Sequence, residues 1–234
     1  MVKLFRVLVR DRDRQVAYYH PGVGTLADPG LRTPLAKKLS VILGGAFGYG
    51  LTRNIEGAYA YLMEHYEEGD RIFIFGFSRG AYTARALAAF INECGLLEKG
   101  CQNLIPYAMN LFKQRAPAPD QLDDADAAGE AAALGESEEL KARKAEFFRL
   151  RSMFKSTYAR KFVKPNFKAS AQDPNPFHYK VDIAFLGLWD TVKFYGWLWN
   201  PVIVRREQGQ NPRALTVRHA LALDERRKLF QQMH

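Results

Sequence analysis

Two apolar runs are continuous enough to predict strands that are buried inside a sheet. They cover Arg71–Phe75 and Val181–Trp189. Strands that are buried on both faces have this pattern, whereas half-exposed strands alternate apolar and polar residues. The apolar residues also predict two shorter strands, at Phe5–Val9 and Gln15–Tyr19, of which the second ends at a glycine-containing turn.

Segments with helical spacing lie between these strands. Thr52–Tyr66 follows a glycine-rich stretch and carries apolar side chains three and four residues apart. An alanine-rich segment, 81–93, follows the first buried strand and ends before Gly95. Because strands and helices alternate, we expect an α/β fold, with a mainly parallel sheet that is flanked by helices.

Between residues 98 and 178 the character of the sequence changes. Asp120–Glu139 is acidic and contains no base, whereas 141–168 is basic apart from Glu146 and is interleaved with aromatic residues, as in an amphipathic helix. We expect a single domain over 1–234, with 98–178 as a helical cap or insertion. In one interpretation this insertion is solvated and its aromatic face packs on the core. In the other it caps the site and presents a cationic face to an anionic substrate or membrane.

Composition narrows the class of protein. The chain has 234 residues, of which 47% are hydrophobic and 25% charged, and these values exclude global disorder. No apolar stretch has the length of a membrane span, and the N-terminus lacks the pattern of a signal peptide. Two cysteines cannot form a disulfide framework or a four-ligand zinc site. The net charge of +9 indicates anionic partners without identifying them.

A Gly-x-Ser-x-Gly pattern follows the first buried strand and places Ser78 between that strand and the alanine-rich helix. A serine nucleophile must project from a tight turn, and small residues two before and two after it allow the backbone to turn. The backbone N–H of Arg79 would be one oxyanion donor, and Gly22 and Val23 are candidates for the second. The alternative is a glycine-rich turn in which Ser78 only caps the helix.

Asp190 directly follows the second buried strand. Its carboxylate is therefore expected at the carboxyl edge of the sheet beside Ser78, as the acid of a triad. The alternative role is an N-cap for the next segment.

His219 is the candidate base, because it follows both Ser78 and Asp190 in the chain. Asp224 and Glu225 are alternative carboxylates that could orient it. The remaining histidines are less suitable, because they precede the serine, lie at the wrong end of a strand or end the chain: His20, His65, His178 and His234.

Six blocks carry a family resemblance: YYHPGVGT, GGAFGYG, RIFIFGFSRGAYTARALA, GLL, FLGLWDTV and HALALDERR. In this order they resemble the α/β-hydrolase domain family that includes the type VI secretion lipase effectors. The resemblance implies an α/β-hydrolase fold with Ser78 as nucleophile, Asp190 as acid and His219 as base. Relatives usually open with a strand that ends in Asp-Gly-Thr, so we expect that first strand to be missing, and His20 stands where an acid is common.

The expected function is that of a serine hydrolase that cleaves carboxylic esters, above all those of lipids or phospholipids, through an acyl-enzyme and without metal or cofactor. The expected partners are a lipid substrate, a membrane surface contacted by the basic 141–168 segment, and an immunity or secretion partner. The protein would be cytoplasmic in the producing cell and delivered to another cell by a secretion system. The rival hypothesis is an inactive hydrolase-like module that binds a membrane or a secretion or toxin partner. Nucleic acid is not expected, because the bases are spread and no recognition motif accompanies them.

Overall fold

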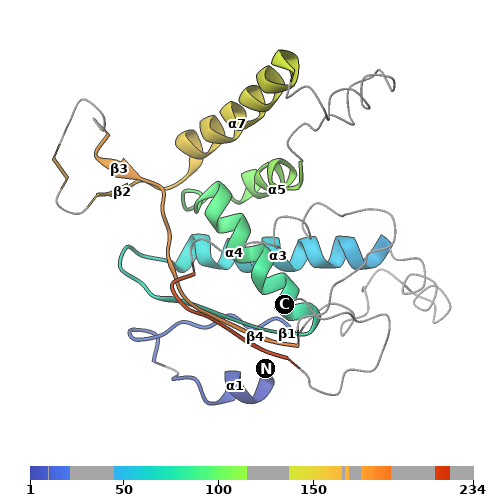
Figure 1. The fold of residues 1–234 in the computed structure, drawn as a ribbon. Coiled ribbons are helices and arrows are strands. Elements are labelled where there is room, and N and C mark those ends of the chain that lie inside the picture. The colour runs from blue at the N-terminus through green and yellow to red at the C-terminus, as the bar shows by residue number, and fades with distance from the viewer. Residues whose placement is uncertain are drawn as a thin grey trace.

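The computed structural model describes residues 1–9, 11–21, 45–114, 137–164, 167–168, 175–190 and 214–221. Its helices are α1 (Val2–Arg6), α3 (Gly45–His65), α4 (Arg79–Cys94), α5 (Ile105–Lys113) and α7 (Glu138–Tyr158), with a 3₁₀ turn η1 (Gln102–Leu104). Its strands are β1 (Ile72–Phe77), β2 (Phe162–Val163), β3 (Phe177–His178), β4 (Ile183–Trp189) and β5 (Val217–Ala220). Figure 1 shows their arrangement.

The main sheet is parallel, with the strand order β1-β4-β5. The pairing of β1 with β4 ends with Phe77 opposite Trp189, and the pairing of β4 with β5 ends with Trp189 opposite Ala220. Helices flank this sheet, so the α/β fold expected from the sequence is confirmed. Because the strands are parallel and in register, their carboxyl ends meet at one edge.

Helix α4 covers one face of the sheet and forms the centre of the core with α3. The alanines of α4 allow this helix to approach the strands closely. The buried core combines these alanines with large side chains of α3, α4 and β4: Ile55, Tyr59, Met63, Ala81, Ala84, Ala88, Phe90, Ile91, Ile183, Leu186 and Leu188. Close packing of α4 against α3 and the strands therefore fixes the position of the first residue of α4 relative to the sheet.

The opposite face of the sheet differs from the expectation. Continuous apolar runs predicted burial on both faces, but on β1 Phe73 is 49%, Phe75 36% and Phe77 55% exposed, and on β4 Trp189 is 37% exposed. The cause is that α3 and α4 lie on the same side of the sheet (Figure 1). The apolar runs therefore predicted the positions of the strands correctly, but the prediction that both faces of these strands are buried was wrong.

The N-terminal strands are not formed. The expected strand at Phe5–Val9 is wrong, because residues Val2–Arg6 form α1, in which the Phe5 N–H donates to the Met1 carbonyl (3.0 Å). The expected strand at Gln15–Tyr19 is also wrong, since this segment has no ladder partner among the described residues. Short alternating runs fit strand and helix equally, and a strand needs a neighbour to satisfy its backbone.

The segment 98–158, which is most of the expected insertion over 98–178, begins and ends at adjacent points. Leu97 and Ala159 form an antiparallel bridge, and the Arg160 N–H donates to the Leu96 carbonyl (2.7 Å). The segment 138–158 forms the helix α7, but its apolar side chains do not gather on one buried face, and only Leu140 of its residues is buried. Figure 1 shows α7 farther from the sheet than α4.

Contacts of α7 concentrate at the C-terminal end of α4. Arg151 forms an ion pair with Glu93 (2.8 Å), and the Lys155 Nζ donates to the Asn92 carbonyl (2.9 Å). Ser78 lies at the other end of α4, about 20 Å away along the axis of a helix of 16 residues. The helix α7 therefore lies beside the end of α4 that is remote from Ser78.

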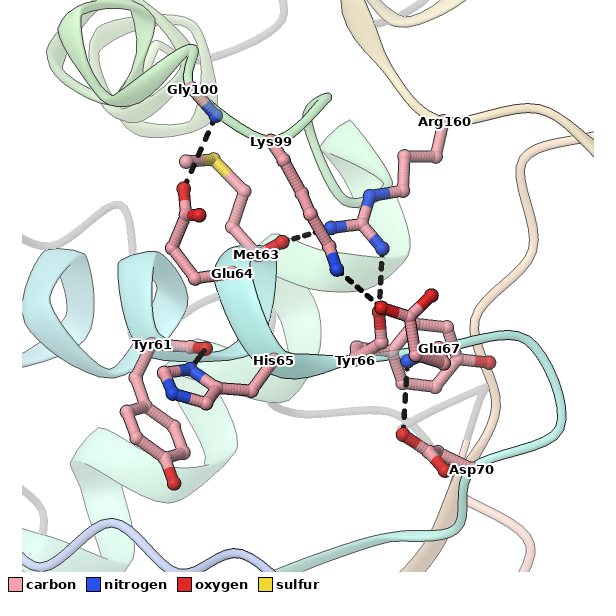
Figure 2. A network of polar contacts seen from close by, with 10 residues as sticks. All are labelled: Tyr61, Met63, Glu64, His65, Tyr66, Glu67, Asp70, Lys99, Gly100 and Arg160. Atoms are coloured by element: carbon pink, nitrogen blue, oxygen red, sulfur yellow. Dashed lines mark hydrogen bonds and ion pairs between the residues drawn. The ribbon is translucent and has the colours of Figure 1, made fainter.

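A polar network, shown in Figure 2, holds the segment that leads into β1. Buried Arg160 donates to the carbonyl of Tyr66 (2.6 Å) and to that of Met63, at the end of α3. Lys99 pairs with Glu67, and Asp70 accepts the Glu67 N–H (2.9 Å). A cation at a helix C-terminus satisfies carbonyls that have no partner within the helix. This network fixes the amino end of the sheet against the core.

Candidate functional site

Ser78 occupies the tight turn between β1 and α4 that the sequence predicted. Its backbone has φ 54° and ψ −120°, which is a left-handed conformation that residues other than glycine rarely adopt. Its carbonyl accepts the Ala81 N–H (3.0 Å), so that the helix begins directly after it. A strained backbone at this point is an observation that favours a functional role.

The side chain of Ser78 does not cap the helix. Ser78 stands at the N-cap position of α4, but its hydroxyl forms no capping hydrogen bond. The alternative in which this serine only caps α4 therefore lacks the interaction on which it depends. The half-buried hydroxyl is left available for another partner.

Gly76 explains why the turn is so tight. A Cβ at this position would lie 2.3 Å from the Gly80 carbonyl oxygen and 2.5 Å from the Ala81 Cα. The start of α4 therefore contacts the backbone of β1 directly. A Cβ at Gly80 would meet nothing within 4 Å. The two glycines of the motif thus have different roles, and steric necessity applies only to the first.

Asp190 lies beside Ser78 at the carboxyl edge of the sheet. Each directly follows a strand, and the last residues of those strands, Phe77 and Trp189, are paired. The Ser78 N–H donates to the Trp189 carbonyl (2.8 Å), and the Asp190 N–H donates to the Ala220 carbonyl (2.7 Å). Two hydrogen bonds therefore extend the ladder one residue beyond β1 and β4 and hold both residues at the same level.

The carboxylate of Asp190 is unusual in two respects. Its backbone has φ 49°, which makes it, with Ser78, one of two described non-glycine residues with a positive φ. Its Oδ1 is buried and has no hydrogen-bond partner among the described residues. A buried carboxylate oxygen without a partner is costly in a folded protein. Because the Oδ1 of Asp182 shares this property, the positive φ at the end of a strand is what distinguishes Asp190.

His219 lies in β5, on the strand next to that of Asp190. It is half-buried and pairs with Leu188, so it is on the same face of the sheet as α4. Leu188 in turn pairs with Gly76, two residues before Ser78. At about 3.3 Å per residue, His219 therefore lies roughly 6–7 Å below the edge that carries Ser78 and Asp190. The structure brings the serine and the acid together and places this histidine one strand over and deeper in the sheet.

Three other histidines lie in the described residues, and two of them have contacts away from Ser78. The His65 ring stacks on Tyr61 (4.0 Å between centroids), and its Nδ1 is 2.8 Å from the Tyr61 carbonyl oxygen. His178 is in β3, before β4, and its Nδ1 accepts the Lys180 N–H (3.1 Å). For His20, which is exposed, partial desolvation lowers the pKa of the imidazole and favours its neutral form.

The candidate oxyanion donors differ in what the structure describes. Arg79 is the first residue of α4, so its N–H belongs to the N-terminal turn of that helix, directly after Ser78. The second candidates, Gly22 and Val23, lie outside the described residues, as do Asp224, Glu225 and His234.

Sequence reasoning missed two contributors to this site. They are the carbonyl groups of Trp189 and Ala220, which hold the backbones of Ser78 and Asp190. Backbone groups leave no signal in residue types, and only a correct strand register could have found them. Within the described part of the chain, no group of three or more potential metal ligands is present, and no helix is long and apolar enough to cross a membrane.

These observations define an α/β protein whose polar, strained residues gather at the carboxyl edge of a parallel sheet. The chain belongs to the family described as T6SS phospholipase effector Tle1-like, catalytic domain, which it matches over residues 1–234. It is also similar to the uncharacterized protein YEL023C of Saccharomyces cerevisiae, with 30% identity over 240 residues. The match covers 100% of this chain but only 29% of the length of the yeast protein. No solved structure matches.

Proposed function

We propose that this chain is a serine hydrolase of carboxylic esters, with Ser78 as nucleophile and lipids or phospholipids as substrates. The observation that carries the proposal is the turn at Ser78, whose strained backbone presents a hydroxyl that caps nothing, beside the buried carboxylate of Asp190. Strain of this kind is characteristic of a nucleophile turn between a strand and a helix. Membership of a family described by phospholipase effectors supports the lipid substrate.

In the proposed mechanism, His219 takes the proton from the Ser78 Oγ as this oxygen attacks the ester carbonyl. Asp190 holds the imidazole in the tautomer that can accept that proton and stabilises the imidazolium. The Arg79 N–H, with one from Gly22 or Val23, stabilises the oxyanion. The alcohol leaves with the proton from His219, and water deprotonated by the same ring then releases the acyl group. The protein needs no metal or cofactor for these steps.

The role of His219 rests on chain order and on the position of β5 beside β4. Its depth below the edge of the sheet makes it the member of the triad that most needs a separate test. His219→Gln removes the base and keeps a side chain of similar size. If Ser78→Ala abolishes activity while His219→Gln retains it, the base is a different residue and only this part of the mechanism fails.

A fluorophosphonate probe tests the nucleophile directly, because it reacts with an activated serine. The folded wild-type protein should be labelled at Ser78, as located by mass spectrometry, and Ser78→Ala should take no label. Ser156→Ala is a matched control on α7, where the hydroxyl donates to the Met153 carbonyl (3.0 Å), and it should be labelled like the wild type. A folded wild-type protein that takes no label contradicts the proposal.

The substrate and the partners form a second part of the proposal. Contact between the basic 141–168 segment and an anionic bilayer would anchor the domain, since bases and exposed aromatic residues alternate along α7. Delivery to another cell and an immunity or secretion partner follow only from the description of the family, and the similar yeast protein carries no such description. Release of fatty acid from vesicles of defined headgroup tests the substrate class.

The second candidate is an inactive hydrolase-like module that binds a membrane or a protein partner. The depth of His219 in β5 favours it, because a serine attacks an ester only when a base contacts its hydroxyl. Sedimentation with anionic vesicles that is equal in wild type and Ser78→Ala, together with no probe labelling and no fatty-acid release, supports this candidate.

A further inference from the structure

The open face of the sheet is the largest feature that the proposed function does not use. We define it as the side chains that point away from α4, and they alternate along β1 and β4: Phe73, Phe75, Phe77, Phe185 and Trp189. Gly187 lies among them. The rings contact each other: the centroid of the Phe75 ring is 5.7 Å from that of Phe185 and 6.2 Å from that of Trp189. These rings form one continuous aromatic surface.

None of the described elements buries this surface. Helix α1 lies on this side of the sheet in Figure 1, but none of its residues is buried. Parallel sheets are normally covered by helices on both faces, because a face left in water exposes apolar side chains. Among the described elements this face therefore lacks the helical cover that a parallel sheet usually has.

The size of the open face favours one helix over a second copy of the chain. Aromatic side chains bury about 150–250 Å² each, so the exposed fractions amount to roughly 350 Å² of apolar surface. Stable protein interfaces bury about 800 Å² per partner, which is more than twice this area. The apolar stripe of a helix of four turns covers an area similar to that of the open face.

Two arginines give the open face a positive charge, which favours a negatively charged partner. The Arg71 guanidinium lies over the Phe73 ring (5.2 Å), at one end of the open face. Arg218 pairs with Gly187 and is exposed, which places it on the open face beside the aromatic rings. Two copies of the chain packed through this face would bring four cations together, whereas carboxylates beside an apolar stripe would pair with them.

From these observations we propose that the open face binds an amphipathic helix of a second protein, with an apolar stripe flanked by carboxylates. This docking site is separate from the Ser78 hydroxyl, and it does not depend on the proposed hydrolase activity. The apolar stripe lies across the rings of β1 and β4, and its carboxylates contact Arg71 and Arg218.

The test uses two labelled 18-residue helical peptides with the same leucine stripe, one flanked by glutamates and the other by lysines. Fluorescence anisotropy with the intact chain should give at least tenfold tighter binding for the glutamate peptide. Phe73→Ser should weaken that binding by a similar factor. Phe148→Ser, which removes an exposed ring of α7, is the matched control and should leave it unchanged.

Charge reversal gives a second test that does not alter the aromatic rings. The double variant Arg71→Glu, Arg218→Glu should reverse the preference, so that the lysine peptide binds more tightly. Arg143→Glu, at an exposed position of α7, should keep the original preference. Equal binding of both peptides, or a preference that survives the double reversal, overturns the proposal. A dimer at micromolar concentration that Phe73→Ser dissociates also overturns it, in favour of a second copy.

Discussion

The two ends of the parallel sheet are built in opposite ways. At the amino end, the network around Arg160 gives partners to the last carbonyls of α3 and fixes the segment that enters β1. At the carboxyl end, Ser78 and Asp190 have positive φ angles. The Arg160 network thus supports the entry to β1, whereas the strained backbones lie where β1 and β4 end.

Because of this difference, we expect single substitutions that remove a polar side-chain group to change either the free energy of unfolding or the proposed hydrolytic activity, but not both. A change at the amino end should lower the free energy of unfolding and leave the activity of each folded molecule intact. Removal of the side-chain oxygen of Ser78 at the carboxyl end should do the reverse. Residues that break this rule identify where the two ends are coupled.

The largest effect is expected for Ser78→Ala. Loss of a nucleophile should lower ester hydrolysis by a factor of about 10⁴ or more. The melting temperature should stay within about 2 °C of the wild type, because the hydroxyl makes no capping bond. Initial rates on a soluble chromogenic ester, together with a thermal melt, measure both quantities. Retention of hydrolysis would show that the serine is not the nucleophile.

Arg160→Met should have the largest effect at the amino end. It leaves the buried carbonyls of Met63 and Tyr66 without their donor and should lower the free energy of unfolding by about 2–4 kcal/mol. Urea denaturation followed by circular dichroism measures this loss. Lys161→Met, at the exposed neighbouring position, is the control and should change little. The comparison between the two ends breaks down if the folded fraction of Arg160→Met also loses its activity.

Gly76→Ala and Gly80→Ala should separate the two glycines of the motif. A Cβ at Gly76 meets backbone atoms that cannot move alone, so we expect a loss of about 1–3 kcal/mol in stability and a loss of activity. A Cβ at Gly80 meets nothing within 4 Å, and alanine is the better helix former, so this variant should be neutral or slightly stabilised. Equal effects of the two substitutions would contradict the close contact between β1 and α4.

Tyr59→Phe is expected to have a smaller effect. The buried Tyr59 hydroxyl donates to the Gly95 carbonyl (2.8 Å) and accepts the Leu97 N–H (3.0 Å), at the end of α4 that is remote from Ser78. Its removal should lower the free energy of unfolding by about 1–2 kcal/mol without a change in ester hydrolysis. Tyr107→Phe, at an exposed position of α5, should leave both unchanged.

The smallest effect concerns the exposed pair of Glu67 and Lys99. The hydrogen bond from Lys99 lowers the pKa of the Glu67 carboxyl below 4.5. The contribution of this pair is therefore fully present above pH 4.5 and is lost as the pH falls through the lowered pKa. Glu67→Gln should melt slightly below the wild type at pH 7 and at the same temperature near pH 2. A difference that persists at low pH would exclude the ionised carboxylate as its cause.

Much of the fold could be predicted because strong local patterns specify it. The apolar runs of β1 and β4 and the alanine-rich α4 were correctly identified, and their order in the chain placed Ser78 and Asp190 at one edge. The strand β5 was not predicted, because Arg218 and His219 interrupt its apolar pattern. The N-terminal strands were predicted wrongly, since alternation alone does not supply a neighbouring strand. The positions of Ser78 and Asp190 could be predicted because each directly follows a strand. The depth of His219 in the sheet could not, because it depends on the pairing register of β4 and β5, which no residue type specifies.

The bridge between Leu97 and Ala159 has a consequence for how such chains diversify. It closes the base of the segment 98–158, so that the two ends of this segment are adjacent. Loop closure changes slowly with length, and segments with adjacent ends are tolerated as insertions. The part of this segment that can change in length is the part outside α5, because Ile105, Ala108 and Phe112 of α5 belong to the core. Insertions there should leave the register of the strands that carry Ser78 and Asp190 unchanged.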